Sequence, residues 1–258
     1  MHAMLTEGYR QRFGGIGRLF GLAGMERLSS ASVAVVGVGG VGSWTVEGLI
    51  RSGVGRVVMI DGDDVCVTNT NRQLPALSGA VGRPKTAVLA ERMRLINPEA
   101  EVEECVEFLG AGNVERLLPG GVDFVIDAVD RAAVKALMIA HCCGRGIPVL
   151  TVGGAGGKVE ASAVRCADLA QAQGDPLLRM VRKELRRTHG FPGGHGESMG
   201  VPCVYSSEVQ RRPPDECGGE SGGSLRMDCA SGWGAGVFVT GVFGLAAAGD
   251  VVRRLADR

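Results

Sequence analysis

The sequence predicts an α/β fold built on a mostly parallel β-sheet with helices on both faces. Short apolar segments alternate with helical stretches between residues 30 and 157, and a glycine-rich turn joins the first segment to the first helix. The chain has 258 residues, of which 45% are hydrophobic, so it is long enough to bury one large core. Lys+Arg and Asp+Glu each number 28, so net charge attracts neither nucleic acid nor membranes, and any basic surface must be local.

Five strands and four helices are expected in the first part of the chain. The strands are predicted over short apolar or alternating runs at residues 32–38, 56–61, 101–106, 123–129 and 147–152. The helices are predicted between them, over residues 41–52, 85–96, 111–118 and 132–144. The first helix opens at the glycine turn and the second follows Pro84, a residue that favours helix starts. This order predicts parallel strands joined by crossover helices.

The alternation of strands and helices ends after residue 157. A strand is expected over residues 158–164 and a charged helix over 175–188, followed by Gly- and Pro-rich loops at 189–200 and 211–224. We interpret residues 1–157 as the core with an N-terminal arm. We interpret residues 158–228 as an insertion rather than an independent domain.

The C-terminal segment 229–249 contains no charged residue and is long enough to cross a bilayer. It is rich in Gly and Ala and only moderately apolar. The preferred interpretation is therefore a helix over residues 229–258 that packs on the core or in a subunit interface. Peripheral or single-pass membrane association is the less favoured alternative.

The motif "GVGGVG" at residues 37–42 follows a predicted strand and opens a helix, the arrangement of Rossmann-like nucleotide sites. Gly37 is expected to make the tight turn, Gly39 to let phosphate approach the backbone, and Gly42 to let helix and strand pack closely. Asp61 ends the next strand, where a carboxylate can accept hydrogen bonds from ribose hydroxyls. These features fit NAD, FAD, ATP and S-adenosylmethionine sites, so they leave the nucleotide open.

Four further polar residues favour a triphosphate. Asn69, Arg72 and Lys85 follow within a short span, and Asp130 comes just after the fourth strand, so all are expected beside the phosphates. Arg72 and Lys85 can neutralise charge on a departing pyrophosphate, and Asp130 can place Mg²⁺. Hydride transfer needs none of these groups. Each residue alone has an ordinary alternative, a solvated surface charge or a helix cap, so the prediction depends on their joint placement.

Several segments together resemble the adenylating superfamily of ThiF, MoeB and the ubiquitin-activating enzymes. They are "GVGGVGSW", "DGDDVCVTNTNRQ", "GRPKTAVLAERMRLINP", "DFVIDAVD" and "GGAGG". The second half, with "DLAQAQGDPLLRMVRKELRR", "PCVYSSE" and "RMDCASGWGA", is similar to the tRNA threonylcarbamoyladenosine dehydratases within that superfamily. The resemblance implies a homodimer that uses ATP to activate the carboxylate of N6-threonylcarbamoyladenosine in tRNA, which closes into a cyclic form with loss of water.

The resemblance also implies roles for individual residues of an adenylation core. Phosphate would be cradled by Gly37, Gly39, Gly40 and Gly42, and the rest of the nucleotide site would include Asp61, Asp63 and Asn69. The catalytic residues would be Arg72, Lys85, Asp130, which also places Mg²⁺, and Arg12. Arg12 would reach the ATP of the neighbouring subunit; its alternative is an arginine in a frayed N-terminal segment. A monovalent cation and a cysteine desulfurase partner are further implications that the sequence leaves open.

Two other functions stay open. An enzyme of the same chemistry could activate the C-terminus of a ubiquitin-like or sulfur-carrier protein, and a noncatalytic nucleotide-binding scaffold could serve a sulfur relay. Relatives that activate sulfur carriers commonly hold zinc between two C-x-x-C pairs, which this sequence lacks. No structural zinc is therefore expected, and tRNA is the preferred substrate. A scaffold would have no reason to retain Arg72, Lys85 and Asp130 together.

The eight cysteines are spread along the chain without a signal peptide, which favours reduced thiols and a cytoplasmic protein. Cys229 is expected to be structural, and the neighbouring Cys142 and Cys143 are expected to be core residues, as are the other thiols. Ring closure within the substrate requires no enzyme thiol.

The predicted helix at residues 175–188 carries five basic residues at helical spacings that place them on one face: Arg179, Arg182, Lys183, Arg186 and Arg187. A solvated helix face is the ordinary interpretation of such a run. We expect contact with tRNA phosphates instead, because the helix lies in the segment that resembles the dehydratases. Flanking Gly-rich loops could adapt to an RNA surface.

Overall fold

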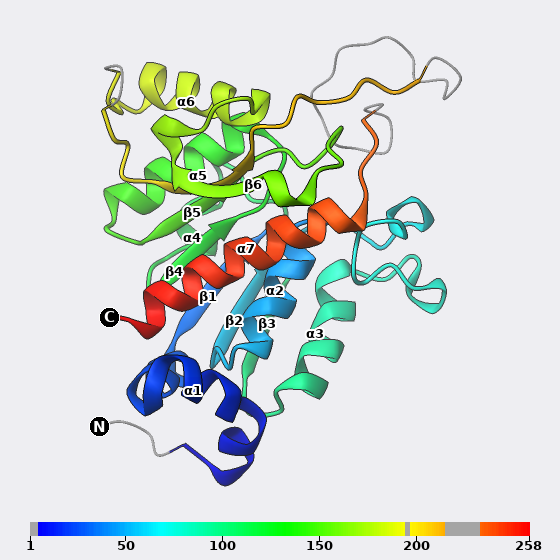
Figure 1. The fold of residues 1–258 in the computed structure, drawn as a ribbon, viewed down its shortest axis with the longest axis vertical. Helices are drawn as coiled ribbons and strands as arrows, with labels where there is room; N and C mark the ends of the chain where they lie inside the picture. Colours follow the sequence, from blue (N-terminus) through cyan, green and yellow to red (C-terminus); the bar gives the residue numbers. More distant parts are fainter. Residues whose placement is uncertain (1–4, 194–196, 215–232) are drawn as a thin grey trace.

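Seven strands form one sheet in a computed structural model that describes residues 5–193, 197–214 and 233–258 (Figure 1). The strand order is β3-β2-β1-β4-β5-β7-β6, with parallel pairs except for the antiparallel pair of β6 and β7. The bounds are β1 Ser32–Val36, β2 Arg56–Ile60, β3 Glu101–Cys105, β4 Phe124–Asp127, β5 Val149–Val152, β6 Val164–Asp168 and β7 Pro202–Ser206. The five strands predicted in the first part of the chain are confirmed.

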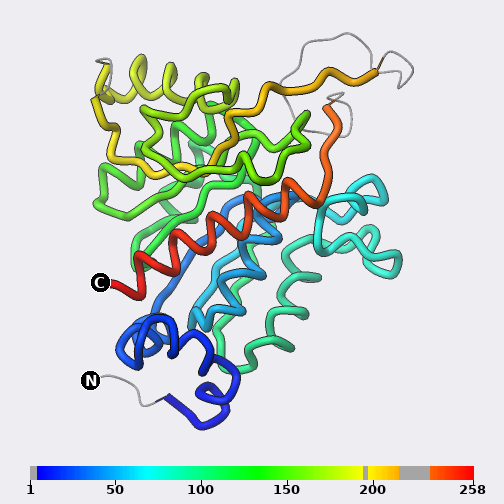
Figure 2. Tube along the Cα trace, in the orientation of Figure 1, coloured from blue at the N-terminus to red at the C-terminus, as the bar shows by residue number. Residues whose placement is uncertain are grey.

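Helices cover both faces of this sheet, as predicted (Figures 1 and 2). They are α1 Glu7–Ser30, α2 Gly42–Arg51, α3 Lys85–Ile96, α4 Val114–Leu117, α5 Ala132–Gly144, α6 Pro176–Thr188 and α7 Val237–Ala256. Val33 and Val35 of β1 face one core cluster with α2, α3 and α7, whereas Ala34 and Val36 face a second with α5 and α6. Since successive side chains of a strand point to opposite faces, burial on both sides explains the continuous apolar run of β1.

The strand predicted over residues 158–164 is wrong. A short 3-10 helix occupies Ala161–Ala163, and the strand begins only at Val164. The N–H groups of Val159 and Glu160 donate to the carboxylate of Glu208 instead of to a neighbouring strand. From Val164 onward the backbone pairs with β7, so this segment extends the sheet of the core.

Helix α1 was not predicted, because its glycines weaken the helical pattern. It begins at a cap in which the N–H of Tyr9 donates to Oγ1 of Thr6 at 3.0 Å, and it kinks at Gly21, where φ is 72°. Tyr9 and Phe13 are buried against each other, with ring centroids 4.7 Å apart. Tertiary burial therefore stabilises a helix of weak intrinsic propensity.

Helix α7 packs on the core through small residues. A Cβ at Gly244 would lie 2.5 Å from the backbone oxygen of Val41, and one at Gly48 would lie 2.7 Å from Cβ of Ala248. This close approach to α2 explains the Gly- and Ala-rich composition of the predicted apolar segment, whose residues 229–232 lie outside the described structure. Among the residues that the structure describes, no helix has the length and apolar character to span a membrane.

Candidate active site

A glycine turn between β1 and α2 forms one wall of a pocket at the carboxyl edge of the sheet. Gly37 has φ of 82°, and a Cβ there would lie 3.0 Å from the backbone oxygen of Ala128. A Cβ at Gly42 would lie 1.8 Å from the oxygen of Gly37, so only glycine allows this packing of helix on strand. Gly40 and Val41 line the pocket, which places the positive end of the α2 dipole beside it.

The pocket has a volume of about 320 Å³ and borders the ends of β1, β2, β4 and β5. This volume is in the range of small-molecule and cofactor sites, about 300–1,000 Å³. Its lining includes most of the predicted nucleotide-site residues: Gly37, Gly39, Gly40, Asp61, Asp63, Arg72, Lys85 and Asp130. Segments more than 90 residues apart in sequence thus meet at one site, as expected at the carboxyl ends of parallel strands.

Lys85 is a buried cation on the pocket wall. Its side chain is 6% exposed, and Nζ donates to Oδ2 of Asp63 at 2.7 Å. Lys85 is the first residue of α3, and its N–H donates to the backbone oxygen of Asp63 at 3.0 Å, so the backbone holds the two side chains together. Asp63 is the more accessible partner, 52% exposed, and a bound phosphate could replace it as the counter-ion of Lys85.

Arg72 reaches the same pocket from the loop between β2 and α3. Its Nη1 donates to Oδ1 of Asn71 at 2.9 Å. Its backbone oxygen accepts from Nε1 of Trp44 in α2 at 3.1 Å and from Oγ1 of Thr240 in α7 at 3.4 Å. The loop that carries this cation is therefore attached to two helices.

Asp61 is held beside the glycine turn by backbone donors. Its Oδ2 accepts from the N–H of Val38 at 2.7 Å and its Oδ1 from the N–H of Asp63 at 2.8 Å. Burial raises the pKa of the Asp61 carboxyl above its usual value, although Lys85 and the two N–H groups partly oppose this shift. Each carboxylate oxygen retains a lone pair for a ribose hydroxyl.

Asn69 and Gly42 do not line the pocket. Gly42 has the packing role described above. The Oδ1 atom of Asn69 accepts from the N–H of Cys66 at 3.0 Å, and its backbone oxygen accepts from the N–H groups of Arg72 and Gln73. A short amide side chain readily bonds its own backbone in this way. Asn69 therefore shapes the loop that presents Arg72, whereas contact with phosphate was predicted.

Arg12 lies far from the pocket of its own chain. It is exposed on α1, whose Tyr9 hydroxyl donates to the backbone oxygen of Gly53, just beyond the C-terminal end of α2. The pocket borders the opposite end of α2, a helix of 10 residues. At the usual rise per residue, the two ends are about 15 Å apart.

Gln73 is a pocket residue to which the sequence analysis gave no role. It is 9% exposed, and among the described residues its Oε1 has no hydrogen-bond partner. The amide lies beside Gly39, 3.6 Å from the position of a Cβ there. A buried amide oxygen without a partner suits a donor group on a ligand. Its position directly after Arg72 was the available signal, whereas Leu177 and Thr240 reach the pocket from distant segments that gave none.

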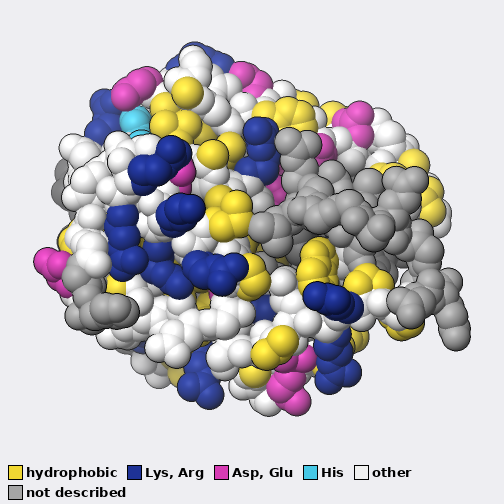
Figure 3. All heavy atoms as spheres, turned by 90° about the horizontal axis from the view of Figure 1, so that it is seen from above, with side chains coloured by type: hydrophobic (Ala, Val, Ile, Leu, Met, Phe, Trp, Pro, Cys, Tyr) yellow, Lys and Arg dark blue, Asp and Glu magenta, His cyan; other side chains and the backbone are white. Residues whose placement is uncertain are grey.

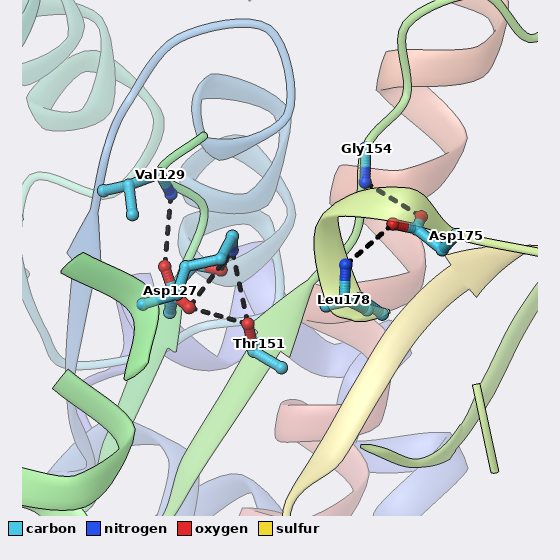
Figure 4. A network of polar contacts seen from close by, with 7 residues as sticks. Asp127, Val129, Thr151, Gly154, Asp175 and Leu178 are labelled. Atoms are coloured by element: carbon cyan, nitrogen blue, oxygen red, sulfur yellow. Dashed lines mark hydrogen bonds and ion pairs between the residues drawn. The ribbon is translucent and has the colours of Figure 1, made fainter. Parts of the chain in front are cut away.

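A buried ion pair supports the loop that carries Asp130. Asp127, at the end of β4, accepts through Oδ2 from Nζ of Lys135 at 3.1 Å and from the hydroxyl of Thr151 at 2.6 Å (Figure 4). Its Oδ1 accepts from the N–H of Val129 at 3.2 Å, next to Asp130 in sequence. Asp127 and Lys135 are fully buried, so their charges compensate each other inside the protein.

The family comparison agrees with this geometry. The family model described as ThiF family matches residues 15–258. The chain belongs to the ThiF family. This ThiF-family chain is 43% identical over 252 residues to the tRNA threonylcarbamoyladenosine dehydratase of Haemophilus influenzae, with 98% of this chain and 96% of that protein covered.

Solved structures of relatives share the fold of this ThiF-family chain. The crystal structure of the E. coli tRNA N6-threonylcarbamoyladenosine dehydratase TcdA in complex with ATP matches with a TM-score of 0.88 and 39% identity, covering 98% of this chain and 97% of that one. The complex of the same enzyme with AMP matches with the same TM-score, 0.88. The predicted family resemblance is confirmed.

Helix α6 of this ThiF-family chain presents a basic surface, made of the predicted side chains (Figure 3). Arg179, Lys183, Arg186 and Arg187 are exposed, but Arg182 is half-buried and its Nη1 donates to the backbone oxygen of Leu169 at 3.2 Å. Burial lowers the pKa of Arg182, and the nearby Arg186 adds to this effect. Arg187 pairs with Glu184 at 2.9 Å. The five cations are therefore not equally available to a ligand.

The thiols of this ThiF-family chain only partly match the prediction. Cys142 is buried, and burial raises its pKa to about 12. The prediction of core thiols is wrong for Cys66, Cys143 and Cys166, which are exposed, whereas Cys203 is buried as predicted. Cys229 lies outside the described residues.

Proposed function

We propose that this chain is a tRNA threonylcarbamoyladenosine dehydratase, which uses ATP to cyclise N6-threonylcarbamoyladenosine in tRNA. The observation that carries this proposal is the joint placement of Arg72, Lys85 and Asp130 with the glycine turn around one pocket. Similarity over nearly the whole chain to the dehydratase of Haemophilus influenzae, and to the ATP complex of TcdA, supports it.

The reaction has two steps, of which the first activates a poor electrophile. A carboxylate oxygen of the threonyl group attacks the α-phosphorus of ATP, the bond to the β-phosphate oxygen breaks, and pyrophosphate leaves. A nitrogen of the substrate's own urea group then attacks the acyl carbon, and AMP leaves with the former carboxylate oxygen. The nitrogen loses its proton, so the net change is loss of water. Because the second step is intramolecular, proximity supplies much of the acceleration.

The pocket residues fit the charges of these steps. The glycine turn and the α2 N-terminus suit the phosphates, and Asp61 suits the ribose. Arg72 and Lys85 neutralise negative charge as pyrophosphate leaves. We propose that Gln73 accepts a hydrogen bond from the bound nucleotide or substrate through its unpartnered Oε1.

The carboxylates of Asp130 and Asp63 fit Mg²⁺. Within the described part of the chain, no cluster of three metal-binding acidic, His or Cys side chains occurs. Mg²⁺ commonly needs only one or two carboxylates together with phosphate oxygens and waters, and both residues line the pocket. We propose Asp130 as the main ligand, because Asp63 already pairs with Lys85. The ion would neutralise phosphate charge during adenylation.

We propose a homodimer in which Arg12 contributes to the partner's site. Arg12 and the pocket border opposite ends of α2, so the arginine cannot serve the site of its own chain without a large rearrangement. A symmetric dimer places the same surface of each copy on the other, and it can therefore bring each α1 to the opposite pocket. Ring closure involves no sulfur, so this proposal does not require a cysteine desulfurase partner.

The exposed cations of α6 are the proposed contact with tRNA phosphates. They are grouped on one helix although the chain has no net charge, which concentrates the positive potential locally. Leu177, in the first turn of the same helix, lines the nucleotide pocket. RNA bound on α6 would thus lie next to the adenylation site. With tRNA as its substrate, the enzyme would act in the cytoplasm.

The test is incubation of the purified protein with ATP, Mg²⁺ and tRNA that carries N6-threonylcarbamoyladenosine. Mass spectrometry of the nucleosides should show a product lighter by one water molecule, with AMP and pyrophosphate released in equal amounts. Activation of a carrier protein's C-terminus without any change in the tRNA would contradict the proposal. Such a result would favour the alternative of a carrier-activating enzyme.

A further inference from the structure

Asp175 connects the nucleotide pocket to the basic helix α6. Its Oδ1 accepts from the N–H of Leu178 at 3.0 Å and so caps the helix, while its Oδ2 accepts from the N–H of Gly154 at 3.0 Å (Figure 4). Gly154 lines the pocket, and so does Leu177 in the first turn of α6. One carboxylate therefore holds both the pocket wall and the start of the helix.

Lys158 compensates this carboxylate inside the protein. The two side chains are 0% exposed, and Nζ of Lys158 lies 3.2 Å from Oδ2 of Asp175. The ammonium also donates to the backbone oxygen of Ser206, at the end of β7, at 2.9 Å and lies 5.7 Å from the ring centroid of Phe243 in α7. The pair thus joins the loop after β5 to α6, β7 and α7.

The packing around Asp175 leaves little room for adjustment. A Cβ at Gly153 would lie 2.3 Å from Oδ2 of Asp175, so a larger residue there would displace this carboxylate. The N–H of Gly153 donates to the backbone oxygen of Val204 in β7 at 2.8 Å, which fixes the same loop to the sheet. Direct contacts at Asp175 therefore hold the pocket wall and the start of α6 together.

We infer that Asp175 is a positioning residue that sets the RNA-binding helix relative to the adenylation site. This inference rests on the function proposed above. RNA held on α6 must bring its modified nucleoside to the nucleotide in the pocket, and a displacement of about 1 Å can lower such a rate by about 10²-fold. Asp175 acts on the rate of adenylation, the step that precedes ring closure, rather than on the affinity for either ligand.

The variant that separates these effects is Asp175→Asn combined with Lys158→Met. Asparagine caps a helix as well as aspartate does, but its NH₂ group takes the place of one carboxylate oxygen, so only one of the two positions that accept from Leu178 and Gly154 keeps an acceptor. The second substitution removes a buried cation that would otherwise lose its counter-ion. ATP affinity from calorimetry and tRNA affinity from filter binding should stay close to wild type. The single-turnover rate of cyclisation at saturating ligands should fall by about 10²-fold.

Asp168→Asn is the matched control. Asp168 is a carboxylate at the end of β6 that accepts from the N–H groups of Met199 and Gly200, and it does not line the pocket. This variant loses comparable hydrogen bonds near α6, yet its rate should stay near wild type.

Three results would count against the inference, and they differ from one another. An unchanged cyclisation rate in the double variant would overturn it. A lower rate would also overturn it if the loss of ligand affinity, or a loss of folded protein seen in a thermal melt, accounts for the whole decrease. A wild-type protein that binds both ligands but forms no ring would instead overturn the proposed function, and the inference with it.

Discussion

Lys85 and Asp63 form an ion pair of 2.7 Å on the wall of the nucleotide pocket, with side chains that are 6% and 52% exposed. Because Lys85 has lost most of its contact with water, its charge acts strongly on phosphate charge that develops beside it. Lys85→Met should therefore lower turnover by about 10²–10³-fold, the usual effect of losing one donor to the transition state. Steady-state cyclisation assays at saturating ATP and tRNA measure this.

Arg83→Met is the control for this prediction. Arg83 lies two residues before Lys85, in the loop that leads into α3, but its guanidinium pairs with Glu91, and it does not line the nucleotide pocket. Its removal should leave turnover near wild type. An equal loss in the two variants would mean that the loop, and not the buried cation, is what the reaction needs.

Asp130→Asn should raise the Mg²⁺ concentration that gives half-maximal activity, because an amide binds this cation more weakly than a carboxylate. The comparison variant is Asp123→Asn, just before β4, whose carboxylate binds the N–H of Ser32. Titration of cyclisation with Mg²⁺ distinguishes the two. If Asp130→Asn keeps the wild-type requirement, the metal is held elsewhere, with Asp63 as the next candidate.

Arg12 and Asp130 should complement each other between subunits. Arg12→Ala and Asp130→Ala should each be nearly inactive, but a mixture should regain partial activity because one of the two sites in a hybrid dimer has both wild-type residues. Arg10→Ala, which alters an exposed position on a different side of α1, should be active by itself. Absence of recovery, when subunit exchange is demonstrated by mixed affinity tags, would contradict action in trans.

The exposed cations of α6 should determine the salt dependence of tRNA binding. Replacement of Arg179, Lys183 and Arg186 by Gln removes exposed charges that are not paired with an acidic side chain within the described residues. The slope of log K against log salt should become less steep by about two to three units. ATP affinity should not change. Arg187→Gln should have a smaller effect, since Glu184 already neutralises that charge; an unchanged slope in the triple variant would place the tRNA elsewhere.

Protonation of Asp61 should weaken adenosine binding as the pH falls. This loss should begin at a higher pH than it would for an aspartate with an ordinary pKa. Burial raises the pKa of Asp61 above its usual value of 3.8, and ribose hydroxyls donate to the ionised carboxylate. Binding therefore needs pH above this raised pKa. The free energy of unfolding depends on pH in the opposite direction. The folded state holds the Asp61 proton more tightly than the unfolded state, so protonated Asp61 favours folding at pH values below its unfolded-state pKa. This contribution is lost as the pH rises through its folded-state pKa.

Calorimetry with adenosine, which carries no titrating phosphate, measures this pH dependence directly. The variant Asp61→Asn should bind more weakly at neutral pH and should lose the acid-dependent change. If wild-type binding does not vary as pH falls toward 3.8, Asp61 does not contact the ribose in its ionised form.

The local sequence was sufficient to predict the elements that repeat a simple pattern. The helices at Lys85–Ile96 and Ala132–Gly144 have the predicted bounds. Helical periodicity and the residues that start and stop a helix are local features, so a short stretch of sequence contains them. The convergence of Gly39, Arg72 and Asp130 also followed from sequence, since parallel strands bring their carboxyl ends to one edge.

Tertiary structure decided the features that depend on distant partners. Helix α1 forms because Tyr9 and Phe13 are buried, although its glycines disfavour a helix. Asn69 turns to its own loop, where its Oδ1 accepts from the N–H of Cys66. Asp175 reaches Gly154 across 21 residues of sequence, and no local pattern records such a contact. Burial and long-range hydrogen bonds depend on which segments meet, and that is fixed only when the whole sheet is assembled.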